Sequence, residues 1–445
     1  MIAEREFLLA RRFLFGAGKH GNRATAAIIG IALSLVPLVV VIHVADGMIE
    51  GITTRFFETG TYHIQAIARH SMTLEQLSSA ATTVASIPAV QNASAERSGF
   101  GLLYTDAGRA GATIRALDPD VWVHDPGFRR YLELLDGAFD LGAPNSIVLG
   151  REIASRLDVS PGDPVRLLTV RTVNGGFLPR VGTFVVTGVF STGYQDLDRL
   201  WAIIPISRGV EILAPESGRY SIGVKVADPK ALPNPLFSRT AFSDRGDAER
   251  IVGSIQTALG AEWRVFTWFE LERSRFVSFV TTKNLLAFIM FLIVFVAAIT
   301  ISSSLVLLVL EKQQEIGYLK STGVSPATIR TSFVFAGFTI GVFGAALGLS
   351  VGLIITVNVN EILRAIEWVL NVGVSTVRFL GAPLSNDAGI SIFNQEFYLE
   401  TIPITVRADA LAIAAGITIS ASTIAAFFPA RRAAMIRPLE VLRRH

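Results

Sequence analysis

The sequence predicts an α-helical membrane protein with four transmembrane helices and a large mixed α/β domain inserted between helices 1 and 2. Two observations predict this class. Hydrophobic residues make up 51% of the 445 residues and charged residues only 17%, whereas an ordinary soluble domain is about one-quarter charged. Four apolar runs, at 26–45, 285–310, 333–357 and 411–428, also contain no Asp, Glu, Lys or Arg, and they reach or approach the roughly 20 residues that a spanning helix needs.

Hydropathy delimits the four spans and the segments between them. Transmembrane helices are expected at residues 26–46, 284–310, 333–357 and 409–428. The fourth run is short and rich in Ala, Ser and Thr, so a buried core helix is its main alternative. The other expected segments are an amphipathic N-terminal segment at 1–25, the α/β domain at 47–283, a charged bridge at 311–332, a loop at 358–408 and a tail at 429–445.

Lys and Arg set the expected orientation, because they are enriched in cytoplasmic loops. They gather before the first span, in the bridge and after the fourth span. With four crossings these places lie on one side, so both termini and the bridge are expected to be cytoplasmic and the α/β domain external. The basic residues are Arg5, Arg11, Arg12, Lys19 and Arg23, then Lys312, Lys320 and Arg330, then Arg431, Arg432, Arg437, Arg443 and Arg444.

The inserted domain is expected to fold as two subdomains, one containing a long hairpin and one of β-α-β type. Two strand-like runs, 165–172 and 182–190, flank NGGFLPR, which places the hairpin tip near Gly175 and Gly176. The other elements expected are helices at 74–87 and 247–259, a strand and helix in SIVLGREIASRL at 146–157, and a strand in EWRVFTW at 262–268.

The bridge contains EKQQEIGYLKSTGVSP at 311–326 between two uncharged apolar runs. EKQQEIGYLK reads as a charged extension of the second span, and an ordinary snorkelling helix end would also explain its charges. TGVSPATIR reads as a turn and a short helix, which Ser325 caps and in which Pro326 takes the first position. A short helix lying across the membrane face fits a cleft on another protein. We therefore expect a partner to bind at the bridge.

Glycines recur along the third predicted span at spacings of three or four residues. This spacing places them on one helix face, where a neighbouring helix can approach closely. The pattern predicts intimate packing, either within the subunit or across a dimer. The glycines are Gly337, Gly341, Gly344, Gly348 and Gly352.

Motifs for catalysis and for cofactor binding are missing from the sequence. There is no cysteine, which excludes disulfides and thiolate metal sites, and the net charge of +3 gives no reason to expect nucleic-acid binding. GAGKHG at 16–21 fails as a Walker A loop, because Phe13 replaces its first glycine and His20 its hydroxyl residue. We therefore expect no catalytic, metal or cofactor site in this chain.

His43 and Asp46 lie three residues apart at the outer end of the first span, on one helix face. An ionisable pair inside a membrane can relay protons. The alternative is that both residues sit near the interface and are solvated by water.

Three stretches resemble the FtsX/MacB-type permeases of ABC transporters. EKQQEIGYLKSTGVSPATIRTSFVFAGFTIGVFGAALGLSVG is similar to the bridge and third span of that family, and FFPARRAAMIRPLEVLRRH resembles its C-terminal end. SIVLGREIASRLDVSPGDPVRLL is also similar to the family, and FYLETIPITV at 397–406 resembles the LolC/LolE subunits of lipoprotein-releasing complexes. The bridge positions that match are Lys312, Glu315, Ile316, Leu319, Lys320 and Gly323.

The resemblance implies a permease subunit in a bacterial inner membrane. Two permease chains, either copies or sister subunits, would bind a cytoplasmic ABC ATPase dimer that holds ATP and Mg. Movement of the bridge would reach the periplasmic domain through the spans by mechanotransmission. A lipoprotein in the outer leaflet would enter between the first and second spans and pass to a periplasmic carrier.

The resemblance also implies where these partners bind. ATPase coupling is expected at Glu315, Lys320, Gly323, Val324, Ser325, Pro326 and Ile329. A lipid anchor needs apolar walls, which are expected at Val40, Val41, Val44, Phe288, Phe291 and Phe295. The carrier is expected to contact the hairpin at Asn174, Gly175, Gly176, Phe177, Leu178 and Pro179.

Two other functions remain open. A MacB-like exporter of small molecules or peptides is the nearest, although such chains usually carry a fused ATPase. An FtsX-like signal transmitter would activate an external cell-wall hydrolase, but its external domain is typically much smaller than residues 47–283.

Overall fold

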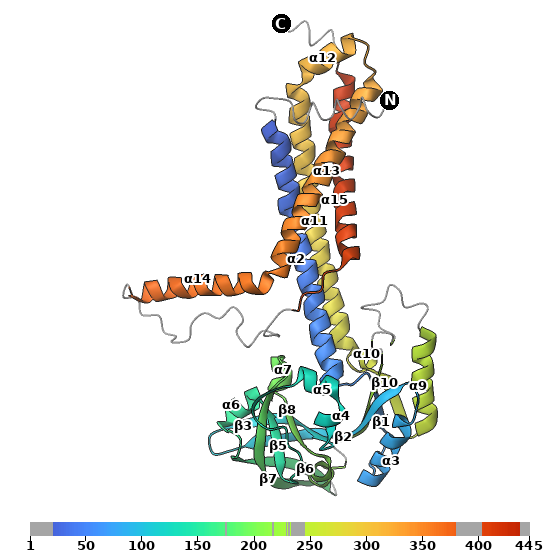
Figure 1. The fold of residues 1–445 in the computed structure, drawn as a ribbon, viewed down its shortest axis with the longest axis vertical. Helices are drawn as coiled ribbons and strands as arrows, with labels where there is room; N and C mark the ends of the chain where they lie inside the picture. The colour runs from blue at the N-terminus through green and yellow to red at the C-terminus, as the bar shows by residue number, and fades with distance from the viewer. Residues whose placement is uncertain are drawn as a thin grey trace. The chain divides into compact units, whose positions relative to one another are not determined.

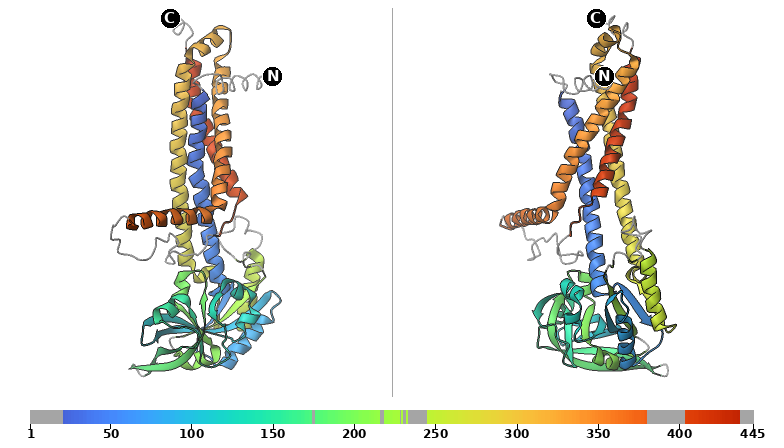
Figure 2. Two further views of the ribbon diagram at one scale, coloured as in Figure 1. Left: turned by 60° about the vertical axis from the view of Figure 1, so that its left-hand side comes forward. Right: turned by 45° about the vertical axis from the view of Figure 1, so that its right-hand side comes forward.

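The computed structural model describes residues 21–173, 176–215, 218–227, 229, 232, 245–379 and 403–436. The chain divides into two compact units. The helical unit comprises residues 1–48, 281–390 and 402–445, and the α/β unit comprises residues 49–280 and 391–401. Figures 1 and 2 show long helices in the first and a mixed sheet with short helices in the second.

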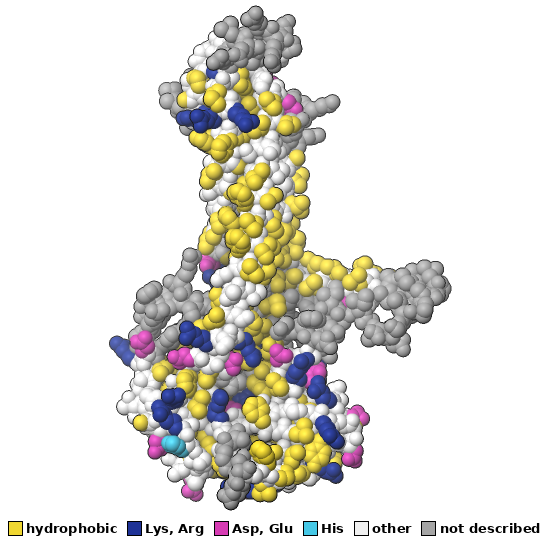
Figure 3. Space-filling view, turned by 180° about the vertical axis from the view of Figure 1, so that it is seen from behind, with side chains coloured by type: hydrophobic (Ala, Val, Ile, Leu, Met, Phe, Trp, Pro, Cys, Tyr) yellow, Lys and Arg dark blue, Asp and Glu magenta, His cyan; other side chains and the backbone are white. Residues whose placement is uncertain are grey.

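Four long helices make up most of the helical unit. They are α2 (Gly21–Thr59), α11 (Arg273–Glu311), α13 (Pro326–Val357) and α15 (Ala408–Met435). Each is long and apolar enough to cross a membrane, which confirms the four predicted spans. Figure 3 shows mainly hydrophobic side chains on this surface, with Lys and Arg gathered at the end that carries the short helix α12 (Gln313–Ser321).

All four helices extend beyond the limits of the predicted spans, and α13 does so by beginning at Pro326 instead of residue 333. α2 continues past residue 46 to Thr59, α11 begins at Arg273 instead of residue 284, and α15 continues past residue 428 to Met435. Hydropathy delimits the part of a helix that lipid surrounds, whereas a helix already nucleated continues into water at little further cost. Pro429 does not end α15, because a membrane helix tolerates the loss of one backbone bond when its neighbours compensate.

The predicted loop at 358–408 is wrong for its first half, which forms α14 (Val359–Phe379). Its apolar residues recur at helical spacing, but polar residues between them keep it below the hydropathy of a span. A criterion built to find spans therefore misses it. Residues 380–402 lie outside the described residues.

The glycine face of α13 packs against two helices of the same chain. The facing pairs are Gly337 with Ala426, Gly341 with Ser422, Gly344 with Ile31, Gly348 with Leu35, and Gly352 with Val39. A Cβ added at Gly337 would lie 2.2 Å from the Cβ of Ala426. The Ser422 hydroxyl also donates to the Gly337 carbonyl at 2.7 Å. α13 thus contacts α15 with its first part and α2 with its second.

The α/β unit is built on a ten-stranded sheet, part of which closes into a ring. The ring runs β2–β3–β8–β5–β7–β6, and β6 pairs back with β2. Its strands are β2 (Val90–Tyr104), β3 (Arg109–Leu117), β5 (Ser146–Gly150), β6 (Pro164–Val173), β7 (Gly176–Ser191) and β8 (Trp201–Pro205). Buried apolar side chains, among them Leu103, Phe184 and Ile204, form the core together with α6 (Arg151–Leu157).

The rest of the sheet continues outside the ring, from β2 through β9 (Arg219–Val226) and β1 (Ile64–Ala68) to β10 (Trp263–Thr267). Helices α3 (Leu74–Ala85) and α9 (Arg245–Leu259) contribute Leu77, Val84 and Ile255 to its core. These elements include the predicted helices near 74–87 and 247–259 and the predicted strand in 262–268, but they belong to the same ten-stranded sheet as the ring. The remaining elements are β4 (Glu133–Gly137), α4 (Val121–His124), α5 (Pro126–Tyr131), α7 (Gln195–Asp198), α8 (Ile206–Ile212) and α10 (Trp268–Leu271).

The β6–β7 hairpin is longer than predicted. Val173 pairs with Gly176, so only Asn174 and Gly175 separate the strands, and both lie outside the described residues. Asn-Gly is the dipeptide that favours two-residue hairpin connections. The predicted tip near Gly175 and Gly176 is confirmed, but residues 177–180, expected between the two strands, belong to β7. Pro179 is compatible with a strand because this part of β7 pairs on one side, with β6.

Candidate functional site

The bridge contains one short helix, α12, bounded by two breaks. α11 ends before Lys312, and α12 ends at Ser321. Gly323 follows with a φ of +93°, a left-handed conformation that costs glycine little. The short helix expected across the membrane face is thus α12, and not the segment after Ser325.

Ser325 and Pro326 start α13, as their sequence predicts. The Ser325 hydroxyl accepts a hydrogen bond from the Thr328 N–H at 3.2 Å, and Pro326 occupies the first helical position. The capping prediction is confirmed. The predicted length is wrong, because the capped helix continues for 32 residues to Val357. No proline or charged residue interrupts it after Arg330.

Lys320 joins α12 to the C-terminal end of α15. Its Nζ donates to the Ala434 carbonyl at 2.9 Å and to the Ile436 carbonyl at 2.7 Å. The last carbonyls of a helix have no partner inside the helix and carry partial negative charge, so a cation there is stabilising. Ile316 and Ile329 are buried in the same helical core. Lys320 and Ile329 therefore stabilise the bridge by contacting α15 and the helical core.

The exposed part of the bridge is a small surface of mixed chemistry. Its exposed members include Glu315, Tyr318, Gly323, Ser325 and Pro326, and Val324 is half-buried. Glu315 forms an ion pair with Lys312 and its side chain is 54% exposed. Tyr318 is 60% exposed and lies three residues after Glu315, on the same helix face. Tyr318 was not among the predicted coupling residues, although its spacing of three residues from Glu315 can be read from the sequence.

Replacing Lys320 with Met should lower the stability of the helical unit by about 1.5–3 kcal/mol, the range for hydrogen bonds to charged groups. The loss arises because two terminal carbonyls of α15 lose their donor. Thermal unfolding of the full-length chain in detergent measures it. Lys312→Met is the matched control, because it removes a cation from the same region without removing a bond to α15. Equal shifts in the two variants would contradict the capping role.

The residues predicted to contact lipid differ in exposure. Phe288, Phe291 and Phe295 on α11 are 58%, 49% and 54% exposed. The valines of α2, at 40, 41 and 44, are half-buried. The phenyl rings thus belong to the outer apolar surface of the helical unit, whereas the valines are partly covered by neighbouring side chains.

Asp46 connects three helices at the end of the spans opposite α12. It forms ion pairs with Lys283 of α11 and with Arg407 next to α15, the latter at 3.9 Å. Asp46 is 8% exposed, and His43 is buried with its Nδ1 2.7 Å from the Val39 carbonyl. The expectation that water solvates His43 and Asp46 is therefore wrong. Burial between other helices replaces water with cationic partners for Asp46.

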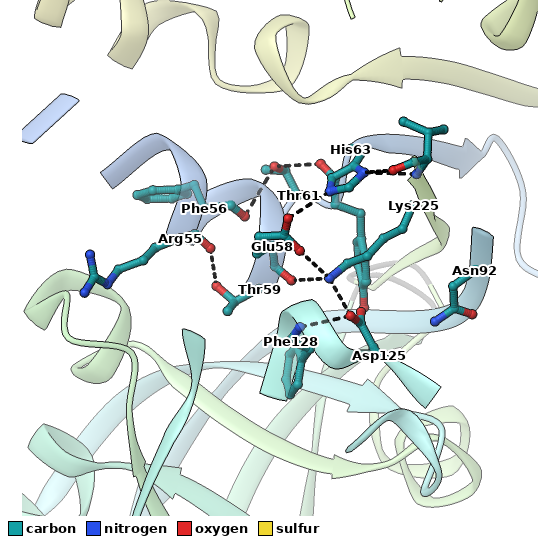
Figure 4. Close-up of polar contacts among 12 residues, drawn as sticks. Arg55, Phe56, Glu58, Thr59, Thr61, His63, Asn92, Asp125, Phe128 and Lys225 are labelled. Carbon is teal, nitrogen blue, oxygen red and sulfur yellow. Dashed lines mark hydrogen bonds and ion pairs between the residues drawn. The ribbon is translucent and has the colours of Figure 1, made fainter. Parts of the chain in front are cut away.

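In the α/β unit, the last turn of α2 is held by Lys225 of β9 (Figure 4). The Lys225 ammonium donates to the Glu58 carboxylate at 2.8 Å, to the Glu58 backbone carbonyl at 2.9 Å and to Asp125 at 2.6 Å. Asp125 also caps α5 by accepting from the Phe128 N–H. Three acceptors satisfy all three N–H groups of the ammonium. This explains how a lysine that is 6% exposed can remain charged.

His63 completes this network on the other side of Glu58 (Figure 4). The His63 Nδ1 lies 3.0 Å from the Val226 nitrogen and 3.2 Å from the Val226 carbonyl oxygen, so this side of the ring contacts the backbone of β9. Nε2 donates to the Glu58 carboxylate at 3.2 Å. Glu58 therefore accepts from both Lys225 and His63.

Arg115 of β3 holds the next residue of α2. It forms two hydrogen bonds with Glu96, at 2.9 and 2.6 Å, and a third with the Thr59 carbonyl. Burial alone would lower the pKa of Arg115, but the adjacent Glu96 carboxylate raises it well above its ordinary value. The guanidinium therefore stays charged. The Tyr62 hydroxyl donates to the same carboxylate at 3.0 Å.

Together these residues form what we call the α2 anchor: Glu58, Thr59, His63, Glu96, Arg115, Asp125 and Lys225. Two buried cations bind the terminal carbonyls of α2, where the helix dipole is negative. The first turns of α11 are held differently, since Phe276 is buried and packs edge-to-face on Trp268 at 5.0 Å. The end of α2 and the start of α11 are thus held by contacts within the α/β unit.

The β6–β7 hairpin carries exposed apolar residues. Phe177 is 79% exposed, and Gly176, Leu178 and Pro179 are also exposed. The strand register places further apolar residues on the same face of the hairpin and of β2: Val170 opposite Pro179, Leu168 opposite Val181, and Leu102 beside Leu168. The apolar surface therefore extends from the predicted tip along the strands.

Across the described ranges, no group of three or more His, Cys, Asp and Glu residues could hold a metal ion.

Two family models match the chain in succession. MacB-like periplasmic core domain matches residues 24–234, which include most of α2 and of the α/β unit. FtsX-like permease C-terminal matches residues 287–438, which include the bridge and the last three spans. The chain is a MacB/FtsX-like ABC permease.

The permease is similar to several lipoprotein-releasing system transmembrane proteins. It is 25% identical to LolC of Xylella fastidiosa (strain Temecula1) over 422 residues, which are 94% of this chain and 93% of that protein. It is 28% identical to LolC of Neisseria meningitidis over 316 residues, or 71% and 67% of the two chains. It is 25% identical to LolE of Haemophilus influenzae over 305 residues, or 67% and 64%. In such transporters the ATPase is a separate subunit.

Sequence reasoning about the permease missed the whole α2 anchor. Its residues come from five separate stretches between Glu58 and Lys225, and none of them forms a local motif. The sequence signal for the α2 anchor was weak. A carboxylate and a histidine, Glu58 and His63, follow closely on an apolar helix, but their partners are supplied only by the folded sheet.

Proposed function

We propose that this permease extracts lipoproteins from the outer leaflet of the bacterial inner membrane and releases them, using ATP hydrolysed by a partner. The observation that carries the proposal is the similarity to LolC of Xylella fastidiosa, which extends over 94% of the chain. Two permease chains, copies or sister subunits, would work with an ATPase dimer that holds ATP and Mg. Both termini and the bridge would face the cytoplasm.

The physics of lipid anchors supports a machine driven by ATP. Each buried CH₂ group contributes about 0.8 kcal/mol to membrane binding, so several acyl chains hold a protein almost irreversibly. A permease for this cargo needs an apolar entry surface and a source of mechanical work. The exposed phenyl rings of Phe288, Phe291 and Phe295, together with Val40, Val41 and Val44, supply candidate walls for that entry.

The contacts of the bridge support a route for that work. A partner that moves α12 also pulls on α15, because Lys320 binds the terminal carbonyls of α15. At the opposite end, Asp46 pairs with Lys283 and Arg407. α2 continues without interruption to Thr59, where Lys225 and Arg115 hold it. Tension on α2 would therefore reach β9 and β3.

The hairpin is the proposed place of release to a periplasmic carrier. Its exposed Phe177 and Pro179 lie on one face of β7 and its exposed Leu178 on the other, and they offer apolar side chains of the kind that an acyl-binding protein could contact. Asn174 and Gly175 complete the proposed contact, although they lie outside the described residues.

Purification of the permease from native membranes, followed by mass spectrometry, tests this proposal. We expect an ABC ATPase and an acylated protein to co-purify. An ATPase accompanied by a cell-wall hydrolase, without acylated cargo, would instead support a signal transmitter. An ATPase accompanied by a bound peptide or small molecule, without acylated cargo, would support an exporter. Either outcome would overturn lipoprotein release.

A charge reversal on the bridge tests the coupling. Changing Glu315 and Gly323 together to Arg should abolish ATP-dependent release of cargo from proteoliposomes, or prevent binding of the ATPase. Both residues are exposed, and Gly323 needs a positive φ that arginine disfavours. Glu211→Arg with Gly260→Arg is the matched control, because it reverses another paired glutamate and replaces another positive-φ glycine in the α/β unit. Normal release by the bridge variant would show that coupling occurs elsewhere.

A further inference from the structure

Helix α14 (Val359–Phe379) has an apolar face that the described residues leave uncovered. It follows α13 after a single residue, Asn358, whose side chain donates to the Ile354 carbonyl at 2.8 Å. Figures 1 and 2 show that α14 then runs across the direction of α13 instead of continuing it. α14 therefore begins where a membrane-spanning helix ends.

The sequence of α14 separates its polar and apolar residues onto two faces. Asn360, Arg364, Glu367 and Asn371 follow one another at spacings of four, three and four residues, which places them in one stripe. The opposite stripe is apolar, and its members are Val359, Ile362, Leu363, Ile366, Val369 and Leu370. Its first part is covered, since Val359 is 8% exposed and Ile362 and Leu363 are half-buried, whereas Ile366, Val369 and Leu370 are 44%, 59% and 42% exposed.

Three observations identify lipid as the occupant of this face. The last turn of α13 presents exposed Ile354 and Val357, so the apolar surface of the span continues directly into α14. The charges of α14 are few and partly neutralised, because Glu361 and Arg364 pair at 3.0 Å. Trp368 is 68% exposed and lies at the border of the polar stripe, a position that tryptophan favours at membrane interfaces.

We infer that α14 lies in the lipid headgroup region, with Ile362, Ile366 and Val369 directed toward the acyl chains and Arg364 and Glu367 toward water. An amphipathic helix of this kind binds by burying its apolar face in the boundary between headgroups and acyl chains. This stretch of α14 has no lysine cluster, so apolar burial, and not attraction to anionic lipid, holds it there. The helix fixes the depth at which α13 leaves the membrane.

Electron paramagnetic resonance of spin-labelled variants tests this inference. The chain has no cysteine, so single substitutions label one site each. Ile362→Cys, Ile366→Cys and Val369→Cys sample the apolar face, while Arg364→Cys and Glu367→Cys are the matched positions on the polar face. The full-length chain is reconstituted in vesicles of phosphatidylethanolamine and phosphatidylglycerol. Collision with oxygen reports lipid, and collision with a water-soluble nickel chelate reports water.

We expect the logarithm of the oxygen-to-nickel ratio to be positive at Ile366 and negative at Glu367, alternating with the helical period. Phe288→Cys on α11 gives the reference for lipid, and the exposed Val123→Cys in the α/β unit gives the reference for water. A nickel-accessible label at Ile366, as at Val123, would overturn the inference. Immobilised labels shielded from both reagents would also overturn it, because they would show that a protein surface, such as a second copy of the chain, covers α14.

Discussion

Lys225→Met should destabilise the α/β unit by about 3–5 kcal/mol, the cost of removing one partner from a buried ion pair. Lys225 lies between two carboxylates, Glu58 and Asp125. Because the site is buried, water does not replace the ammonium group as their partner. Methionine fills a similar volume but leaves two acidic groups close together without a cation. The Glu58 carbonyl at the end of α2 loses its donor at the same time.

Hydrogen exchange of the full-length chain, read by mass spectrometry, measures this effect locally. Faster exchange is expected in peptides covering the last turn of α2 and α5, since Lys225 connects both. Arg208→Met is the matched control, because it breaks an exposed ion pair with Glu211, worth only about 0–1 kcal/mol. Lys225→Arg should restore part of the protection by keeping the charge. If Lys225→Met behaves like Arg208→Met, the α2 anchor does not hold the helix.

The sequence predicted those features that depend on neighbouring residues. Uncharged apolar runs identified four spans because lipid contact needs nothing but length and composition. Ser325 and Pro326 identified the start of α13 because capping involves only the next three residues. The glycine spacing on α13 identified a packing face, although it left open which helices would cover that face.

Features that depend on distant residues or on intermediate polarity were not predicted. The α2 anchor needs Arg115 and Lys225 to meet the end of α2, and only the folded sheet brings them there. α14 is too polar for a span and too apolar for an ordinary loop, so neither criterion recognised it. Phe177 and Pro179 were predicted to lie in a loop, because proline usually ends a strand. Both belong to β7, where proline is tolerated at an edge position.

Gly348→Leu should prevent stable packing of the helical unit, because no space exists for a side chain there. A Cβ at this position would lie 2.9 Å from the Leu35 Cβ and 3.0 Å from the backbone of Ala32. Backbone atoms of α2 cannot rotate away as a side-chain tip can, so α2 and α13 must separate along this contact. Overpacking of a well-packed core typically costs about 1–3 kcal/mol, and a leucine adds three further carbons beyond the Cβ.

Gly30→Leu is the matched control for this prediction. Gly30 lies in α2, also a spanning helix, but an added Cβ there would meet no atom within 4 Å. We expect the thermal unfolding midpoint in detergent to fall strongly for Gly348→Leu and to stay near that of the parent chain for Gly30→Leu, since leucine is the better helix former. Similar midpoints for the two variants would mean that α2 and α13 do not pack through the glycine face. The same outcome would also remove the contact by which α13 and α2 could move as one body when α12 is displaced.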